Sequence, residues 1–116
     1  MTELVEKYFE HWKTKRDDLA WAWDEVTDKV FRSPAEAWPL IIELIRTAPN
    51  DAALSYVAAG PLEDFLCKHG ESFMDRVATA VDQEPRFKQA LQGVWKNSMK
   101  QWVWVEVLRL SGRTGK

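Results

Sequence analysis

The segment AAGPLEDFLCKHGESF, residues 58–73, carries side chains that could form a catalytic centre. Acid, thiol and imidazole groups follow one another closely here: Glu63, Asp64, Cys67, His69 and Glu71. His69 could act as a general base, with Glu63 or Glu71 orienting its imidazole ring. On a continuous helix, however, Glu63 should point away from His69, which weakens this catalytic hypothesis.

The same segment can also be interpreted as a joint between helices. Gly60 precedes Pro61, a pair that can end one helix and begin the next, because glycine accepts the left-handed cap conformation and proline suits a first helical turn. Gly70 is a natural helix stop, so Glu71 would begin another helix. His69 would then lie beside a helix C-terminus, where its ring can reach free carbonyl groups. We favour this structural interpretation.

Helical periodicity of the apolar residues accounts for most of the remaining chain. Apolar stripes and turn residues predict helices over 2–12, 17–32, 34–48, 51–59, 61–69, 71–81 and 85–95. Ser33, Pro34 and Glu36 fit a capping box at the start of the third of these. Residues 99–110 are ambiguous between strand and helix, and we expect a helix because no partner strand is evident elsewhere.

The predicted fold is therefore all-α: a compact array of about seven short antiparallel helices. It resembles helical-repeat proteins in outline, but no residue pattern recurs at a fixed period. Residues 1–112 should form a single domain, and residues 113–116 a loose C-terminal tail.

Composition and charge restrict the function further. The chain has 116 residues, with 16 basic and 18 acidic side chains, so it lacks the basic excess of a dedicated nucleic-acid binder. The single cysteine excludes an internal disulfide and suits a reducing compartment. No signal peptide or membrane span is evident, so we expect a cytoplasmic protein. Two histidines and one cysteine show no metal-ligand spacing, and no phosphate-binding loop or other cofactor motif is present.

Acidic residues gather around one tryptophan in the second predicted helix. The candidate partner-binding residues are Asp17, Asp18, Trp21, Asp24, Glu25 and Asp28. A solvated helix face would have this composition, and so would an acidic docking surface for a basic protein. An exposed tryptophan among carboxylates is typical of a binding hot spot.

The seven tryptophans cannot all be buried. Trp12, Trp23 and Trp95 fall in apolar stripes, which places them in the predicted core. The others, Trp21, Trp38, Trp102 and Trp104, cannot all point inward on single helix faces, so some should be exposed or seal helix junctions.

The runs VAAGPLEDFLCKHGESFMDRV and EPRFKQALQGVW carry a family resemblance. They resemble a small uncharacterised bacterial family, a domain of unknown function with the pattern AAGPLED, HG, RV and PxFxxALxGVW. The resemblance extends from about Ser33 to Trp104. Because the function of that family is unknown, no catalytic residues can be carried over from it. Small bacterial proteins of this kind are associated with toxin neutralisation and with defence or counter-defence systems.

Three functions are compatible with these observations. The first is an immunity-type or counter-defence protein that blocks a basic toxin or effector by binding it. The second is a small enzyme that uses His69 with a nearby carboxylate. The third is a homodimeric scaffold protein whose aromatic residues meet across a symmetric interface.

Overall fold

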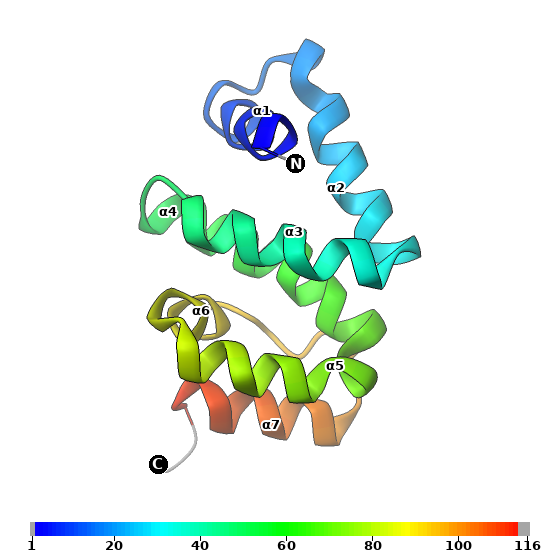
Figure 1. Cartoon of the computed structure of the whole chain (residues 1–116), viewed down its shortest axis with the longest axis vertical. Helices are drawn as coiled ribbons and strands as arrows, with labels where there is room; N and C mark the ends of the chain where they lie inside the picture. Colours follow the sequence, from blue (N-terminus) through cyan, green and yellow to red (C-terminus); the bar gives the residue numbers. More distant parts are fainter. Residues whose placement is uncertain (1, 114–116) are drawn as a thin grey trace.

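The computed structural model describes residues 2–113 and contains α-helices, with no strand among those residues (Figure 1). The elements, in chain order, are α1 (Thr2–Thr14), the 3₁₀ turn η1 (Asp17–Leu19), α2 (Ala20–Arg32), α3 (Pro34–Thr47), α4 (Asp51–Val57), the π-helical turn η2 (Ala58–Leu62), α5 (Glu63–Gln83), α6 (Pro85–Leu91) and α7 (Gln101–Ser111). The all-α prediction is confirmed, and the segment that was ambiguous between strand and helix forms helix α7, which begins at Gln101.

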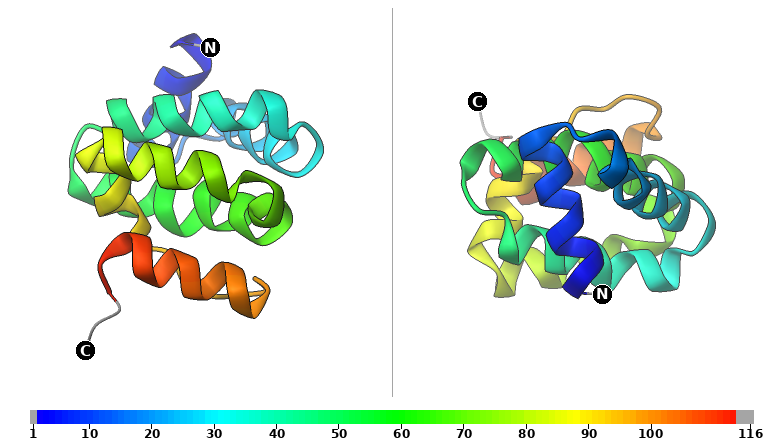
Figure 2. Two further views of the ribbon diagram at one scale, coloured as in Figure 1. Left: turned by 60° about the horizontal axis from the view of Figure 1, so that its bottom comes forward. Right: turned by 90° about the horizontal axis from the view of Figure 1, so that it is seen from above.

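The helices are stacked along the longest axis of the molecule, which measures 43 Å. Helices α1 and α2 lie at one end, α3, α4 and α5 form the middle, and α7 closes the other end (Figures 1 and 2). Helix α3 packs on α2, α4 and α6, while α5 packs on α2, α6 and α7. The core therefore runs through the centre of the stack.

No helix ends at Gly60–Pro61, so the predicted joint at this position is wrong. Proline has no N–H and its ring clashes with the carbonyl four residues back, so it would break an ordinary α-helix. The chain instead widens into η2, where the N–H of Glu63 bonds to the carbonyl of Ala58, five residues back. Helices α4 and α5 are thereby joined into one continuous helical segment.

Gly70 also fails to end a helix, because α5 continues from Glu63 to Gln83. The segment nevertheless changes direction within α5 (Figures 1 and 2). A straight helix from residue 51 to residue 83 would be about 50 Å long, longer than the whole molecule. The bend lies between Phe65 and Phe73. Eight residues of straight helix would separate the two along the helix axis by about 12 Å, but their ring centroids are only 4.9 Å apart.

Gly70 lies within the bend and faces α7. A Cβ atom at this position would be 2.9 Å from Cγ1 of Val103, so only glycine allows α5 and α7 to approach this closely. The glycine that was expected to stop a helix therefore serves helix packing instead.

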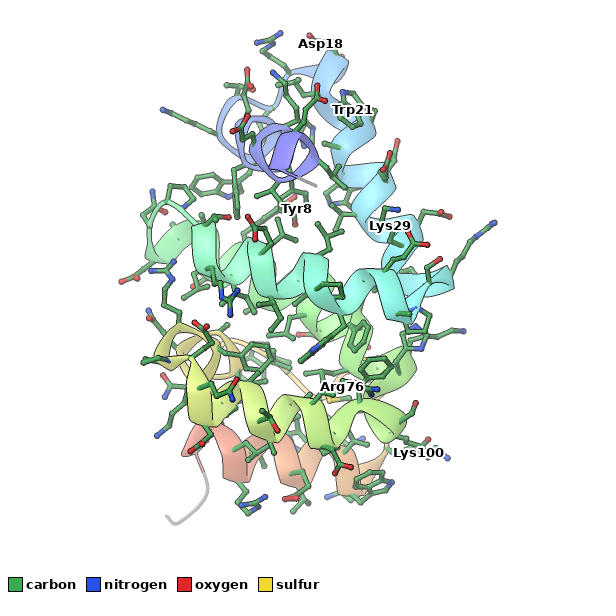
Figure 3. The ribbon with its side chains drawn as sticks, viewed as in Figure 1. Tyr8, Asp18, Trp21, Lys29, Arg76 and Lys100 are labelled. Carbon is green, nitrogen blue, oxygen red and sulfur yellow. The ribbon has the colours of Figure 1, made fainter. Side chains whose placement is uncertain are left out.

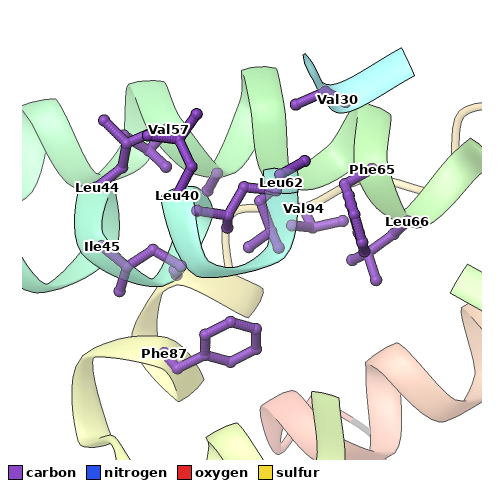
Figure 4. Close-up of a cluster of buried hydrophobic side chains, with 14 of the residues drawn as sticks. Val30, Leu40, Leu44, Ile45, Val57, Leu62, Phe65, Leu66, Phe87 and Val94 are labelled. Atoms are coloured by element: carbon purple, nitrogen blue, oxygen red, sulfur yellow. The ribbon is translucent and has the colours of Figure 1, made fainter. Parts of the chain in front are cut away.

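Apolar side chains from α2 to α6, with Val94 from the following loop, fill the centre of the stack (Figure 4). Trp38 is half-buried over this core, with its ring 5.6 Å from those of Phe65 and Phe87 and 6.0 Å from that of Phe73. Aromatic pairs at such separations stabilise a core beyond the area they bury. This aromatic cluster therefore joins α3, both parts of the bent α5, and α6.

The chain end is anchored further than expected. Arg113, predicted to begin the loose tail, donates hydrogen bonds to the carbonyls of Leu91 and Val94, both at 2.9 Å. Its guanidinium also lies over the Trp104 ring, 5.2 Å from the centroid. The rest of the predicted tail, residues 114–116, lies outside the described residues.

Candidate functional site: an acidic face with an exposed tryptophan

The six candidate partner-binding residues lie on one exposed surface formed by η1 and α2. We call this surface the acid–Trp face: Asp17, Asp18, Trp21, Asp24, Glu25 and Asp28. On α2, helical spacing places Trp21, Asp24 and Asp28 on the side opposite the buried residues Ala22, Val26 and Val30, with Glu25 at the edge of that side. Asp17 and Asp18 lie on η1, directly before α2. All six are exposed, and Trp21 leaves 43% of its surface open to solvent. Figure 3 shows Asp18 and Trp21 at the end of the molecule where α2 begins.

Two carboxylates of the acid–Trp face already have basic partners. Arg16 donates to both carboxylate oxygens of Asp18, at 3.1 and 2.6 Å, and these hydrogen bonds hold the pKa of Asp18 below its usual value. Asp28 forms an ion pair with Arg32 at 3.0 Å. Exposed pairs of this kind contribute little to stability, so a basic partner could displace them at small cost.

The other three carboxylates, on Asp17, Asp24 and Glu25, form no ion pair or hydrogen bond with any side chain among residues 2–113. They lie one helical turn to either side of Trp21. The acid–Trp face therefore combines an apolar anchor with negative charge that remains available to a partner.

A surface hollow of about 420 Å³ adjoins this face between α1, α2 and α3. Leu4, Pro39 and Leu40 supply apolar lining, and Glu25, Lys29, Ala35 and Glu36 complete the wall. Lys29 forms an ion pair with Glu36 at 2.8 Å, so the capping box expected of Ser33 and Glu36 does not form, and Ser33 makes no side-chain cap bond. Glu25 belongs to both the acid–Trp face and the hollow.

Within the 58–73 segment, Glu63 has a structural role. It is buried, its Oε1 accepts from the backbone N–H of Trp95 at 2.9 Å, and its Oε2 accepts from Nδ2 of Asn97 at 3.1 Å. Asn97 has a φ of 46°, a left-handed conformation that asparagine tolerates better than most residues. The Glu63 carboxylate thus fixes the loop that leads from α6 to α7.

The other two candidate catalytic residues contact different parts of the chain. His69 is half-buried, and its Nε2 lies 2.8 Å from the carbonyl oxygen of Val30 in the last turn of α2. Glu71 is exposed and forms an ion pair with Lys100 at 3.2 Å, just before α7. Glu63 and Glu71 thus connect α5 to the loop between α6 and α7, and His69 connects it to α2, an arrangement that favours the structural interpretation of this segment.

The tryptophans divide differently from the prediction. Trp12 does pack against the core. Trp95 was predicted to be buried but is 70% exposed, because α6 ends at Leu91 and the residue lies in the following loop. Trp23 was also predicted in the core, yet it is 43% exposed at the edge of α2. Trp102 is 48% exposed on α7, at the opposite end of the molecule from Trp21.

A buried tyrosine hydroxyl is a feature that the helical pattern does not reveal. Tyr8 on α1 is 2% exposed, and its hydroxyl has no hydrogen-bond partner among the described residues. Burial, with smaller contributions from Tyr56 and Asp64, raises the pKa of Tyr8 well above its usual value. Asp64 is half-buried as well, and burial together with Glu63 raises the pKa of its carboxyl group.

The buried Tyr8 predicts a loss of stability at alkaline pH. Native Tyr8 keeps its proton, whereas an unfolded tyrosine releases it above about pH 10. The free energy of unfolding should therefore fall as the pH rises above about 10, by up to about 1.4 kcal/mol per pH unit from this residue. Urea melts at about pH 9 and about pH 11 should show a smaller decrease for Tyr8→Phe than for wild type. An undiminished decrease in Tyr8→Phe would contradict the assignment.

Among residues 2–113, no group of three or more His, Cys, Asp and Glu side chains is placed so that it could hold a metal ion. None of the helices in this part of the chain is long and apolar enough to cross a bilayer.

Comparison with known proteins identifies a family whose function is unknown. Neither a curated protein nor a solved structure matches the chain. The model of a family of unknown function, DUF6869, matches residues 10–114, so the match begins within α1 and is longer than the resemblance noted over residues 33–104. This chain therefore belongs to DUF6869, a family of unknown function.

Proposed function

We propose that this chain is a non-enzymatic protein-binding module that docks a basic protein through the acid–Trp face. The observation that carries this proposal is Trp21, a large aromatic side chain held 43% exposed among unpaired carboxylates. Covering such a side chain removes apolar surface from water, and tryptophan is prominent among the residues that dominate binding energy. The surrounding carboxylates would attract basic partners and exclude acidic ones.

The partner class that fits best is a basic toxin or effector of the bacterial cytoplasm. A compact, single-domain protein with an acidic face could block such a partner by covering a basic active surface, as an immunity-type or counter-defence protein does. The acidic surface supports this assignment. The candidate catalytic residues Glu63, His69 and Glu71 each have a structural partner instead.

Charge reversal at Asp24 tests the electrostatic part of the proposal. We expect Asp24→Lys to fold normally and to lose at least about 10-fold in affinity for the partner captured from lysate of the native cells, because a like charge would face the partner's basic surface. Asp82→Lys makes the same charge change at an exposed position of α5, far along the chain from this face, and should bind as wild type does.

The captured partner should itself be basic, its binding should weaken as salt is raised, and it should inhibit growth when expressed without this chain. Equal recovery by wild type and Asp24→Lys would exclude the acid–Trp face as the docking surface. A partner that is harmless on its own would exclude the immunity-type role while leaving protein binding intact.

A second candidate function rests on the opposite end of the molecule. Trp102 and Val105 are one helical turn apart on α7, and both are nearly half exposed. Two copies could cover these side chains by packing α7 against α7 about a two-fold axis, which would make the protein a homodimeric scaffold. Light scattering over a range of concentrations distinguishes the two, since Trp102→Ala should abolish a dimer of this kind and Trp21→Ala should not.

A further inference from the structure

We infer that the hollow between α1, α2 and α3 receives an apolar side chain of the partner that is flanked in the partner's sequence by lysine or arginine. This inference rests on the proposed function and identifies the chemistry of the partner segment. The hollow has a volume of about 420 Å³, ample for one large side chain. Leu4, Pro39 and Leu40 give the hollow an apolar lining, and the charged residues Glu25, Lys29 and Glu36 also line it.

The position of the hollow makes it an extension of the acid–Trp face. Trp21, Glu25 and Lys29 follow one another at four-residue spacing, so they form a single row along α2. Trp21 lies at one end of this row, about 12 Å from Lys29, which lines the hollow. Figure 3 shows Lys29 on the part of α2 that approaches α3, with Trp21 nearer the start of the helix. A single partner segment can therefore contact both positions.

The charges around the hollow determine what should flank the apolar side chain. Lys29 is already paired with Glu36, whose Oε1 lies 2.8 Å from its Nζ; this ion pair raises the pKa of Lys29 and lowers that of Glu36. The Glu25 carboxylate has no ion-pair partner among the described residues, and Asp24, likewise without one among them, lies beside it on α2, whereas Asp28 is already paired with Arg32. The rim is therefore net negative, which favours a basic neighbour on the incoming segment and disfavours an acidic one.

Short peptides can test this chemistry without the natural partner. The probe is acetyl-Lys-Phe-Lys-amide, titrated into the labelled protein and followed by two-dimensional NMR. One control peptide, acetyl-Glu-Phe-Glu-amide, reverses the charge, and a second, acetyl-Lys-Gly-Lys-amide, removes the apolar side chain. We expect the probe to shift the signals of Leu4, Lys29 and Ala35, with an affinity at least about 5-fold higher than that of either control, because both features contribute to binding.

Ala35→Phe gives a variant in which the hollow is filled. Ala35 lies on the wall of the hollow and is exposed, so the larger side chain can be accommodated without disturbing the core. Ala52→Phe is the matched control, because Ala52 on α4 is also an exposed helical alanine. Ala35→Phe should abolish the peptide shifts and lower the capture of the natural partner about 10-fold, which corresponds to the loss of one substantial anchor, whereas Ala52→Phe should change neither.

The outcomes separate this inference from the proposed function. Equal shifts with all three peptides, or peptide shifts that persist in Ala35→Phe, would overturn the role of the hollow. If Ala35→Phe captures the natural partner as wild type does while Asp24→Lys loses it, the hollow is not an anchor site and the acid–Trp face stands. If Asp24→Lys and Ala35→Phe both retain the partner, the proposed function fails together with the inference.

Discussion

Phe65→Ala is expected to lower the free energy of unfolding by about 3–5 kcal/mol, as truncation of a fully buried phenylalanine typically does. Phe65 is completely buried, and its ring contacts those of Trp38, Phe73 and His69. Removing it would leave a cavity at the bend of α5, where two helix directions meet and cannot easily close together. The loss would be a large fraction of the stability of a domain of this size.

Urea denaturation of wild type and variant measures this loss directly. Phe65→Leu should cost less, about 1–1.5 kcal/mol, because most of the volume is retained. Phe31→Ala makes the same truncation at a 43% exposed position on α2 and should cost about 1 kcal/mol or less. A loss below about 1 kcal/mol for Phe65→Ala would mean that the aromatic cluster does not hold the two parts of α5 together.

Trp21→Ala is expected to weaken partner binding by at least about 30-fold, a loss of about 2 kcal/mol, which is the threshold for a binding hot spot. Trp21 is on the exposed side of α2 and contributes little to the core, so the variant should unfold within about 0.5 kcal/mol of wild type. Titration of the purified partner into each variant gives the affinities. A loss of binding that is accompanied by a loss of stability would instead indicate misfolding.

Trp102→Ala supplies the matched control for that prediction. Trp102 is exposed to a similar extent, 48% against 43% for Trp21, and also lies on a helix. Helix α7, which carries Trp102, lies at the opposite end of the molecule from the start of α2 (Figure 1). Its replacement should leave the affinity for the partner unchanged, so any difference between the two variants reports on the location of the tryptophan rather than on its loss.

Local sequence signals were sufficient to predict most of the helices. The helix expected over residues 99–110, for want of a partner strand, is confirmed over Gln101–Ser111, where Val103 and Val107 are buried one helical turn apart. Asn50 caps α4 by accepting from the N–H of Ala53 at 2.9 Å, a local bond of the kind that helix-start patterns describe. In both cases the residues that indicate the helix lie within one or two helical turns of each other.

The connection between α4 and α5 could not be predicted in this way. Gly60–Pro61 normally interrupts a helix, and whether the chain breaks or widens into a π turn depends on the tertiary packing around it. The role of Gly70 is likewise decided by Val103, which is distant in sequence and only 2.9 Å from where a Cβ atom would be. Such contacts are not visible in a pattern of neighbouring residues.

Side-chain exposure was predicted least well, because it depends on where elements end. Trp95 would continue the apolar stripe of α6, but the loop turns at Gly93, where an added Cβ atom would be 3.1 Å from Cβ of Ala58. After this turn the chain no longer follows the helical stripe, so Val94 is fully buried while Trp95 is exposed. The exposure of the acidic residues on α2 was easier to predict, since it follows from their helical spacing.

Capture of partners from native cell lysate by wild type, Trp21→Ala and Trp102→Ala, compared by quantitative mass spectrometry, tests the central claim most directly. We predict one stoichiometric basic protein that is recovered by wild type and Trp102→Ala and lost from Trp21→Ala. Equal recovery of that protein by all three forms, or its loss only from Trp102→Ala, would contradict the claim that the acid–Trp face is the docking surface.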